Sequence, residues 1–337
     1  MIEVMHPGMM TTVQDQGRSG YRCWGIPLGG AMDPVALQLA NWLVGNDGAL
    51  AGLEMTLRGP RLRFTVDTLI ALTGADLEAM LDGLPLSNGR AIGVKAGQVL
   101  SFGRCRRGCR GYLAVAGGIT VPLVWDSRST DVRAHLGGFA GRALQAGDQV
   151  PIDAIADSIR ERWKRACPRC DGSGGLTWYV TESAPATKTT GTIVTVRALR
   201  GRWFSRLTPA AQGRCWEQAW QITAAADRMG YRLQGEALAW REPVEMISEG
   251  VAVGAMQVPP DGQPIVLLAD SQTTGGYPVV ANVATIDRSK LAQCKPGDVV
   301  QLQEVTLEEA QAAYRQQAQK LALLKQAIGW RWANERR

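Results

Sequence analysis

Short apolar runs separated by turn signals recur along most of this chain, and they restrict its fold more than any other feature. Between residues 53 and 152 the turns include Asp82–Gly83, Asn88–Gly89, Ala96–Gly97 and Ala146–Gly147–Asp148. Glycine is abundant, with 39 residues among 337. Several short strands joined by such turns are typical of sandwiches and barrels. The sequence therefore predicts a mainly β fold, a β-rich member of the α+β class.

The organisation of the chain predicts two β-rich units. Residues 153–189 differ in character, being charged first and then rich in turn-forming residues, which places a boundary there. We expect an N-terminal unit over residues 1–155, a linker or insert over 156–189, a second unit over 190–305 and a helix over 306–333. The runs Leu144–Val150 and Cys294–Val300 are similar. This similarity indicates either two related barrels or a shared type of turn.

Local end signals predict four helices. Asp33 suits an N-cap, and the proline after it suits the first helical position. Thr306 and Glu309 have the spacing of a capping box at the start of the C-terminal helix. The other two predicted helices are the charged run Asp157–Arg165 and the stretch near Thr208–Gln221.

Charge and composition exclude several classes of protein. The net charge is +6, and most of the excess is arginine in two clusters, at residues 104–110 and 160–169. No recognisable nucleic-acid module accompanies these clusters, so solvated faces or a partner interface are the expected roles. The first residues lack the pattern of a secretory signal, and no apolar run approaches the length of a membrane span. With seven unevenly spaced cysteines, the sequence predicts reduced thiols in the cytoplasm.

The run Asp270–Pro278 stands out because an apolar strand leads directly into it. Residues 264–269 are apolar, as is typical of a buried strand. The chain then changes to hydroxyls, an amide and two adjacent glycines, which let the backbone approach a ligand closely because they have no Cβ. We expect residues 248–277 to form a hairpin whose far end carries this loop. The pattern predicts the floor of a polar small-molecule site, with a plain glycine-rich turn as the alternative.

A second polar, glycine-rich stretch lies near the N-terminus. Asp15 and Arg18 are placed to pair with each other or to contact a charged ligand. Gly29 and Gly30 precede the helix start at Asp33, where free N–H groups favour a carboxylate or a phosphate. In the alternative, Asp33 fills those donors itself as an ordinary cap.

The cysteines allow one metal site. Cys167–Gly174 reads C-x-x-C-x-G-x-G, which is half of a zinc-binding repeat. A closed zinc site needs four ligands. Cys105 and Cys109 would complete the set with Cys167 and Cys170 if the fold brought them together. An unmetallated surface loop is the main expectation, and no metal is expected at the functional site.

The chain carries no catalytic signature that stands by itself. It has no G-x-x-x-x-G-K-[ST] loop, no G-x-S-x-G elbow and no biotin-attachment sequence. Its two histidines leave little room for a Ser–His–Asp triad. The charged pair Asp227–Arg228 is best explained as a structural salt bridge.

Six segments together resemble the family formed by the C subunit of prokaryotic 5-oxoprolinase. This family is also described as allophanate-hydrolase subunit 2-like or as the biotin-dependent carboxyltransferase domain, and it includes KipA. The resemblance covers residues 8–303 and implies that both β-rich units are cyclophilin-like β-barrels. Gly29 departs from the pattern, which has serine there, so no hydroxyl contact is expected from that position. The matching segments are residues 11–21, 25–46, 53–64, 137–148, 227–233 and 248–283.

The resemblance implies an enzyme subunit that is active only with partners. The leading hypothesis is a hydrolase, an ATP-dependent 5-oxoprolinase that opens the cyclic amide 5-oxoproline to L-glutamate with its A and B subunits, the complex holding the ATP. One alternative is biotin-dependent carboxyl transfer, as in urea amidolyase, with biotin supplied in trans. The other is a KipA-like regulatory partner without catalysis.

The candidate substrate-binding residues come from both polar stretches, and no catalytic residue is assigned. In this hypothesis the loop 272–277 cradles the substrate amide or carboxylate, and Gly29–Gly30 with the helix start hold an anion. Asp15 and Arg18 orient that loop. The candidates are Asp15, Arg18, Gly29, Gly30, Met32, Asp33, Gln257, Asp270, Gln272, Thr273, Thr274, Gly275, Gly276 and Tyr277.

Overall fold

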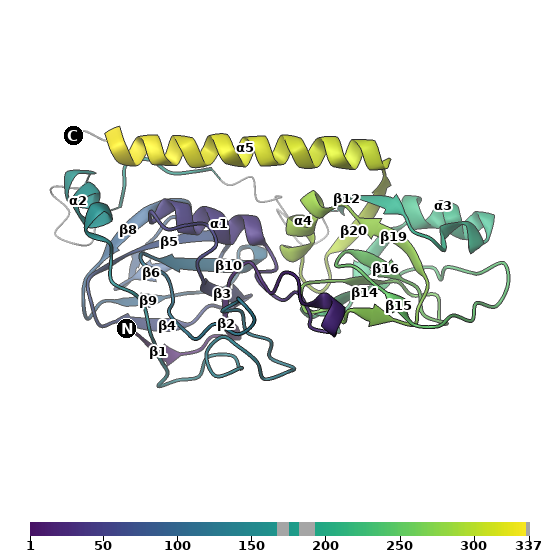
Figure 1. The fold of residues 1–337 in the computed structure, drawn as a ribbon, viewed down its shortest axis with the longest axis horizontal. Helices are drawn as coiled ribbons and strands as arrows, with labels where there is room; N and C mark the ends of the chain where they lie inside the picture. Colours follow the sequence, from purple (N-terminus) through teal and green to yellow (C-terminus); the bar gives the residue numbers. More distant parts are fainter. Residues whose placement is uncertain (167–174, 182–192, 335–337) are drawn as a thin grey trace. The chain divides into compact units, whose positions relative to one another are not determined.

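The computed structural model describes residues 1–166, 175–181 and 193–334, and the chain divides into two compact units (Figure 1). The first unit comprises residues 1–17, 33–184 and 320–337, and the second comprises residues 18–32 and 185–319. The segment 18–32 therefore leaves the first unit and belongs to the second. The sequence-based boundaries do not include this excursion, and they stay a prediction. Much of the predicted insert lies outside the described residues.

The first unit contains two antiparallel sheets that share a hydrophobic core. Their strand orders are β11–β1–β4–β9–β6–β7 and β2–β3–β10–β5–β8. Phe64 of one sheet and Leu113 of the other are both fully buried in this core. The elements are β1 (Ile2–His6), β2 (Met10–Gln14), α1 (Pro34–Leu43), β3 (Gly52–Thr56), β4 (Arg61–Phe64), β5 (Thr68–Asp76), β6 (Met80–Leu81), β7 (Leu84–Pro85), β8 (Ala91–Val94), β9 (Val99–Ser101), β10 (Arg107–Val115), β11 (Gln149–Val150) and α2 (Asp157–Ala166).

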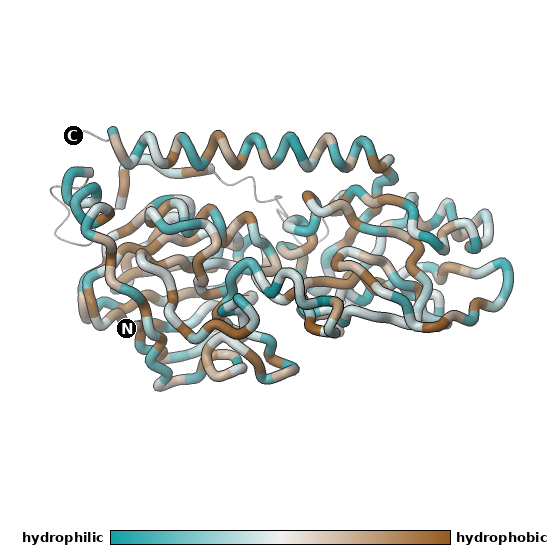
Figure 2. The backbone as a smooth tube through the Cα atoms, viewed as in Figure 1, coloured by the Kyte–Doolittle hydropathy of each residue, from teal (hydrophilic) through white to brown (hydrophobic). Residues whose placement is uncertain are grey.

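The second unit is a closed seven-stranded barrel with the order β12–β19–β16–β17–β14–β13–β20. Apolar residues recur along its strands between polar ones (Figure 2), and Trp220 and Tyr231 are buried in its core together with Met32 from the segment 18–32. Among the described strands of the barrel, only β12 and β20 pair in parallel. The mainly β class is therefore confirmed. The elements are η1 (Arg22–Trp24), β12 (Ile193–Arg200), η2 (Phe204–Arg206), α3 (Pro209–Glu217), β13 (Ala219–Ile222), β14 (Gly230–Gln234), β15 (Glu249–Gly250), β16 (Ala255–Gln257), β17 (Ile265–Leu267), β18 (Thr274–Gly275), β19 (Val279–Val283), η3 (Thr285–Asp287), α4 (Arg288–Ala292) and β20 (Val299–Glu304).

The two similar runs, Leu144–Val150 and Cys294–Val300, form the same turn. In the first unit the carboxylate of Asp148 accepts the N–H of Gln145, and in the second the carboxylate of Asp298 accepts the N–H of Lys295. Gly147 has a φ of +91° and Gly297 a φ of +89°, a left-handed conformation that favours glycine. The repeated sequence therefore corresponds to a shared type of turn.

The predicted helix ends are confirmed. The side chain of Asp33 accepts the N–H of Ala36 at the start of α1, as a cap does. The C-terminal helix α5 (Leu307–Asn334) begins with the predicted capping box, in which Thr306 and Glu309 each accept the other's N–H. Apolar and polar residues alternate along α5 (Figure 2). In the part of the chain that the structure describes, no helix combines the length and the apolar character that crossing a membrane requires.

Candidate functional site

A buried ion pair fastens the segment 18–32 to the polar loop of the barrel. Arg228 Nε and Nη2 donate to the two carboxylate oxygens of Asp270 at 2.7 and 2.8 Å, and both side chains are more than nine-tenths buried. Arg228 Nη2 also donates to Gly30 O at 2.6 Å, and Gly29 N donates to Ala269 O at 3.0 Å. The first glycine pair of the predicted site therefore lies against the start of the predicted loop.

This ion pair corrects two expectations. Arg228 pairs with Asp270 rather than with the neighbouring Asp227, whose carboxylate instead accepts the N–H groups of the next turn, Met229 and Gly230. Asp270 is committed to this pair, and the Gly29 amide is committed to a carbonyl oxygen. Both residues hold the loop in place, so the N–H of Gly29 is not available to the anion that the sequence predicted there.

The loop 272–277 has a fixed backbone and an exposed polar rim. Thr274 and Gly275 form β18, which pairs with β15, and Gln257 Nε2 donates to Tyr277 O at 3.0 Å. Thr274, Gly276 and Tyr277 are exposed, whereas Gln272 and Thr273 are half-buried. The loop therefore presents hydroxyl, amide and phenol groups to solvent. Its backbone is held in place by the pairing of β18 with β15 and by Gln257.

The two glycines of the loop differ in what surrounds them. A Cβ built on Gly275 would lie 2.5 Å from Gln257 Nε2, so any side chain there would push Gln257 aside. A Cβ on Gly276 would meet only Ser248 Oγ, at 3.4 Å. Gly275 is needed for packing, and Gly276 leaves open space at the rim.

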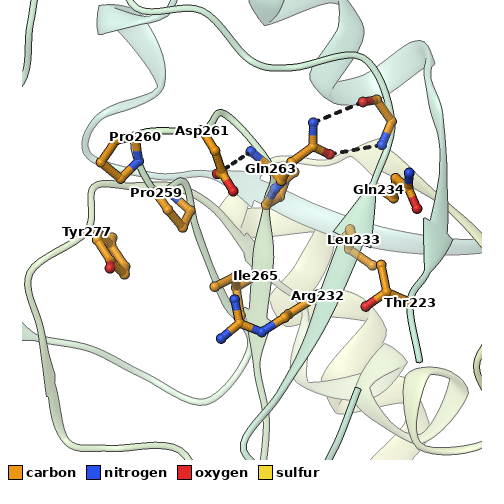
Figure 3. Close-up of a pocket in the computed structure, with 12 residues that line it drawn as sticks. Thr223, Arg232, Leu233, Gln234, Pro259, Pro260, Asp261, Gln263, Ile265 and Tyr277 are labelled. Carbon is orange, nitrogen blue, oxygen red and sulfur yellow. Dashed lines mark hydrogen bonds between the residues drawn. The ribbon is translucent and has the colours of Figure 1, made fainter. Parts of the chain in front are cut away.

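A cavity of about 700 Å³ adjoins the loop, and Tyr277 forms part of its wall (Figure 3). Tyr277 and Pro260 lie on one side of it and Thr223 on the other, with the Arg232 side chain between them. Gln263 braces the wall through two hydrogen bonds to the backbone of Gly235. A volume of this size suits a small organic molecule. The lining residues are Thr223, Arg232, Leu233, Gln234, Gly235, Pro259, Pro260, Asp261, Gln263, Pro264, Ile265 and Tyr277.

Two of the predicted site residues belong to the first unit. The carboxylate of Asp15 accepts hydrogen bonds from Ser127 Oγ, Ser129 Oγ and the N–H groups of Gly17 and Arg128. Asp15 therefore anchors the loop 127–129. The sequence does not indicate this role. Asp33 fills the start of α1 as a cap, which is the alternative that the sequence left open.

The other predicted residues belong to the second unit. They comprise Gly29, Gly30, Gln257, Asp270 and the loop 272–277, together with Arg18 and Met32, which are buried. Arg18 N donates to Leu28 O at 2.6 Å, within the segment 18–32. The segment 18–32 and the loop 270–277 thus form one candidate site on the barrel.

The alternative zinc site has no support among the described residues. No cluster of three or more potential metal ligands occurs within residues 1–166, 175–181 and 193–334. Cys105 Sγ donates to the carbonyl oxygens of Arg107 and Gly108, and Cys109 is buried. Cys167 and Cys170 lie outside the described residues.

Sequence comparison shows that the chain is similar to C subunits of 5-oxoprolinase over most of its length. It is 41% identical to the C subunit of 5-oxoprolinase from Escherichia coli K12, over 99% of this chain and the full length of that protein. It is 38% identical to the C subunit of 5-oxoprolinase from Haemophilus influenzae, over 92% of this chain and 93% of the relative.

The fold of the chain is also similar to part of a solved structure. Urea amidolyase of Kluyveromyces lactis superposes with a TM-score of 0.83 at 30% identity, over 95% of this chain but 20% of that one. Residues 24–304 match the family model described as carboxyltransferase domain, subdomain A and B. The chain belongs to this family of carboxyltransferase domains.

Proposed function

We propose that this chain is the C subunit of an ATP-dependent 5-oxoprolinase and opens 5-oxoproline to L-glutamate together with the A and B subunits. The observation that carries the proposal is the similarity to the C subunit from Escherichia coli, which extends over essentially the whole of both chains. The candidate site is consistent with the role of a partner-dependent subunit, because it offers polar and basic groups but no recognisable nucleophile with its base.

The chemistry of the substrate explains what such a site contributes. The lactam of 5-oxoproline is an unactivated amide, and ATP drives its opening by providing a better leaving group. This chain then needs to bind and orient the ring rather than attack it. The polar rim of the loop 272–277 supplies donors and acceptors for the amide. The ion pair between Arg228 and Asp270 keeps that rim in position against the segment 18–32.

Reconstitution tests the proposal directly. We expect the purified chain, mixed with its A and B subunits, to release glutamate from 5-oxoproline only when ATP is present, and each omission to abolish release. Circular dichroism of every purified protein provides the folding control. Absence of glutamate release from the complete, folded set would contradict the proposal.

Biotin-dependent carboxyl transfer is the second candidate, because the family model and the urea amidolyase structure both support it. A carboxyltransferase needs carboxybiotin from a carrier, since this chain has no attachment sequence of its own. Supplying the purified chain with carboxybiotin on a biotinylated carrier protein, and with urea as the acceptor, distinguishes the two reactions. We expect no carboxylation of urea, whereas carboxylated urea would favour the carboxyltransferase.

Replacing Gly276 with valine is expected to lower turnover by about 100-fold while leaving the protein folded, because a branched side chain would fill the open space at the rim and displace the substrate. The backbone tolerates the change, since only Ser248 Oγ lies within 4 Å of the new Cβ. The measurements are kcat and KM of the complex and the thermal midpoint of the chain.

Gly213→Val is the matched control. Gly213 lies in α3, and a Cβ there meets only the Glu217 carboxylate, at 3.8 Å. This variant should keep wild-type activity. If Gly276→Val were equally active, the loop would not bind substrate.

A further inference from the structure

Two half-buried arginines of the second unit form no salt bridge with any described residue. Arg22 lies in η1, and Arg288 is the first residue of α4. The carboxylate nearest to Arg288 in the sequence, that of Asp287, is already shared by Arg197 and Lys290. The two guanidinium charges are therefore not neutralised within this part of the chain.

Each of these guanidinium groups also has a buried nitrogen without a hydrogen-bond partner. Arg22 Nη2 donates to Val251 O at 2.5 Å and approaches Gln272 O at 3.5 Å, but Nη1 of the same group has no acceptor. Arg288 Nε is likewise buried and has no acceptor. Buried donors in native proteins nearly always bond to protein, water or an ion. The two nitrogens therefore indicate where an acceptor binds.

The two groups meet at one short turn between β15 and β16. Arg22 bonds to Val251 at its start, and a Cβ built on Gly254 would lie 3.1 Å from Arg288 Nε. Burial lowers the pKa of Arg288, and the positive charge of Arg22 lowers it further. Burial also lowers the pKa of Arg22. Two like charges held in this way repel each other unless an anion joins them.

We propose that Arg22 and Arg288 together bind the carboxylate of the substrate. Guanidinium groups are the preferred partners of carboxylates, because their N–H groups match the spacing of the two oxygens. The identity of the ligand rests on the proposed function, whereas the presence of an oxyanion site rests on the two arginines alone.

The position of the pair suits 5-oxoproline. This molecule carries its carboxylate on the ring carbon next to the amide nitrogen, so an anion site and an amide site must lie side by side. Arg22 touches the carbonyl of Gln272, which begins the loop assigned to the amide. Ser271 Oγ, one residue earlier, is buried and has no partner, and it is a further donor at this edge.

Binding to the assembled complex, measured by calorimetry without ATP, tests this inference. The probes are 5-oxoproline, 2-pyrrolidinone, which is the same ring without the carboxylate, and inorganic phosphate. We expect Arg22→Gln and Arg288→Gln each to weaken 5-oxoproline binding by about tenfold or more and to leave 2-pyrrolidinone binding unchanged. Arg202→Gln, which removes an exposed arginine paired with Glu249, is the matched control and should bind like wild type.

Thermal unfolding supplies a second readout. 5-Oxoproline should raise the midpoint of the wild-type complex more than that of either variant, and the midpoints without ligand show whether the variants fold. Unchanged 5-oxoproline binding in both folded variants, or no binding by wild type, would overturn the inference. Arginine-dependent binding of phosphate with which 5-oxoproline does not compete would also overturn it, because the site would then serve a phosphate group.

The outcomes separate this inference from the proposed function. A complex that binds 5-oxoproline through the two arginines but releases no glutamate contradicts the proposed function alone. A complex that releases glutamate at wild-type KM without either arginine contradicts the inference alone.

Discussion

Replacing Asp270 with alanine is expected to lower the free energy of unfolding by about 3–5 kcal/mol, because the charge of Arg228 then stays buried without the Asp270 carboxylate. The side chains of the pair are only 6% and 8% exposed, so water cannot substitute for the missing carboxylate. Arg228 also donates to Gly30 O. We therefore expect the same variant to loosen the segment 18–32 and to impair substrate binding.

Urea unfolding of three variants measures this effect. Breaking the exposed pair Arg200–Glu304 with Glu304→Ala should cost far less stability than Asp270→Ala, because solvent screens such pairs. Removing both buried charges with Arg228→Met and Asp270→Leu should recover much of the loss, since no isolated charge remains. If Asp270→Ala unfolded like the Glu304→Ala control, the buried pair would not fasten the site.

Acid is expected to destabilise the second unit through Asp287, whose side chain is 1% exposed. Burial alone would raise the pKa of this carboxyl, but hydrogen bonds from Arg197 and Lys290 hold it below its usual value of 3.8. The folded chain therefore binds this proton less tightly than the unfolded chain does. The resulting stabilisation is complete above about pH 4 and is lost as the pH falls through the lowered folded value.

Comparison of wild type with Asp287→Asn isolates this contribution. At neutral pH the variant should lose about 3 kcal/mol of unfolding free energy, because the guanidinium of Arg197 and the ammonium of Lys290 lose their shared carboxylate. Urea midpoints measured from about pH 7 to about pH 3 should converge as the wild-type carboxyl takes up its proton. A difference between the two proteins that did not change with pH would contradict the assignment.

The sequence predicts the helix ends well because their physics is local. Asp33 caps a helix that starts at the next residue, and Thr306 and Glu309 bond to each other three residues apart. The strand before the polar loop is similarly readable from its apolar run, although β17 spans only Ile265–Leu267. The cavity beside Tyr277 has no such local signal, because its walls come from several strands.

Long-range partners explain what the sequence could not supply. Asp15 bonds to serines more than 110 residues away, and Arg228 pairs with an aspartate 42 residues away rather than with its neighbour. Local sequence does not single out Arg22 and Arg288, because each is an ordinary arginine until the fold brings both to one turn. Nothing in the spacing of these residues distinguishes them from many solvated charges.

The excursion of residues 18–32 has a consequence for dissecting the molecule. A fragment that starts at residue 190 would lack Met32 in its core. It would also lack the carbonyl oxygen of Gly30, to which Arg228 donates a hydrogen bond. No single break in the polypeptide yields two halves that each keep all their native parts. Separating the barrel for study will require grafting this short segment back onto it, by circular permutation or by supplying it as a free peptide.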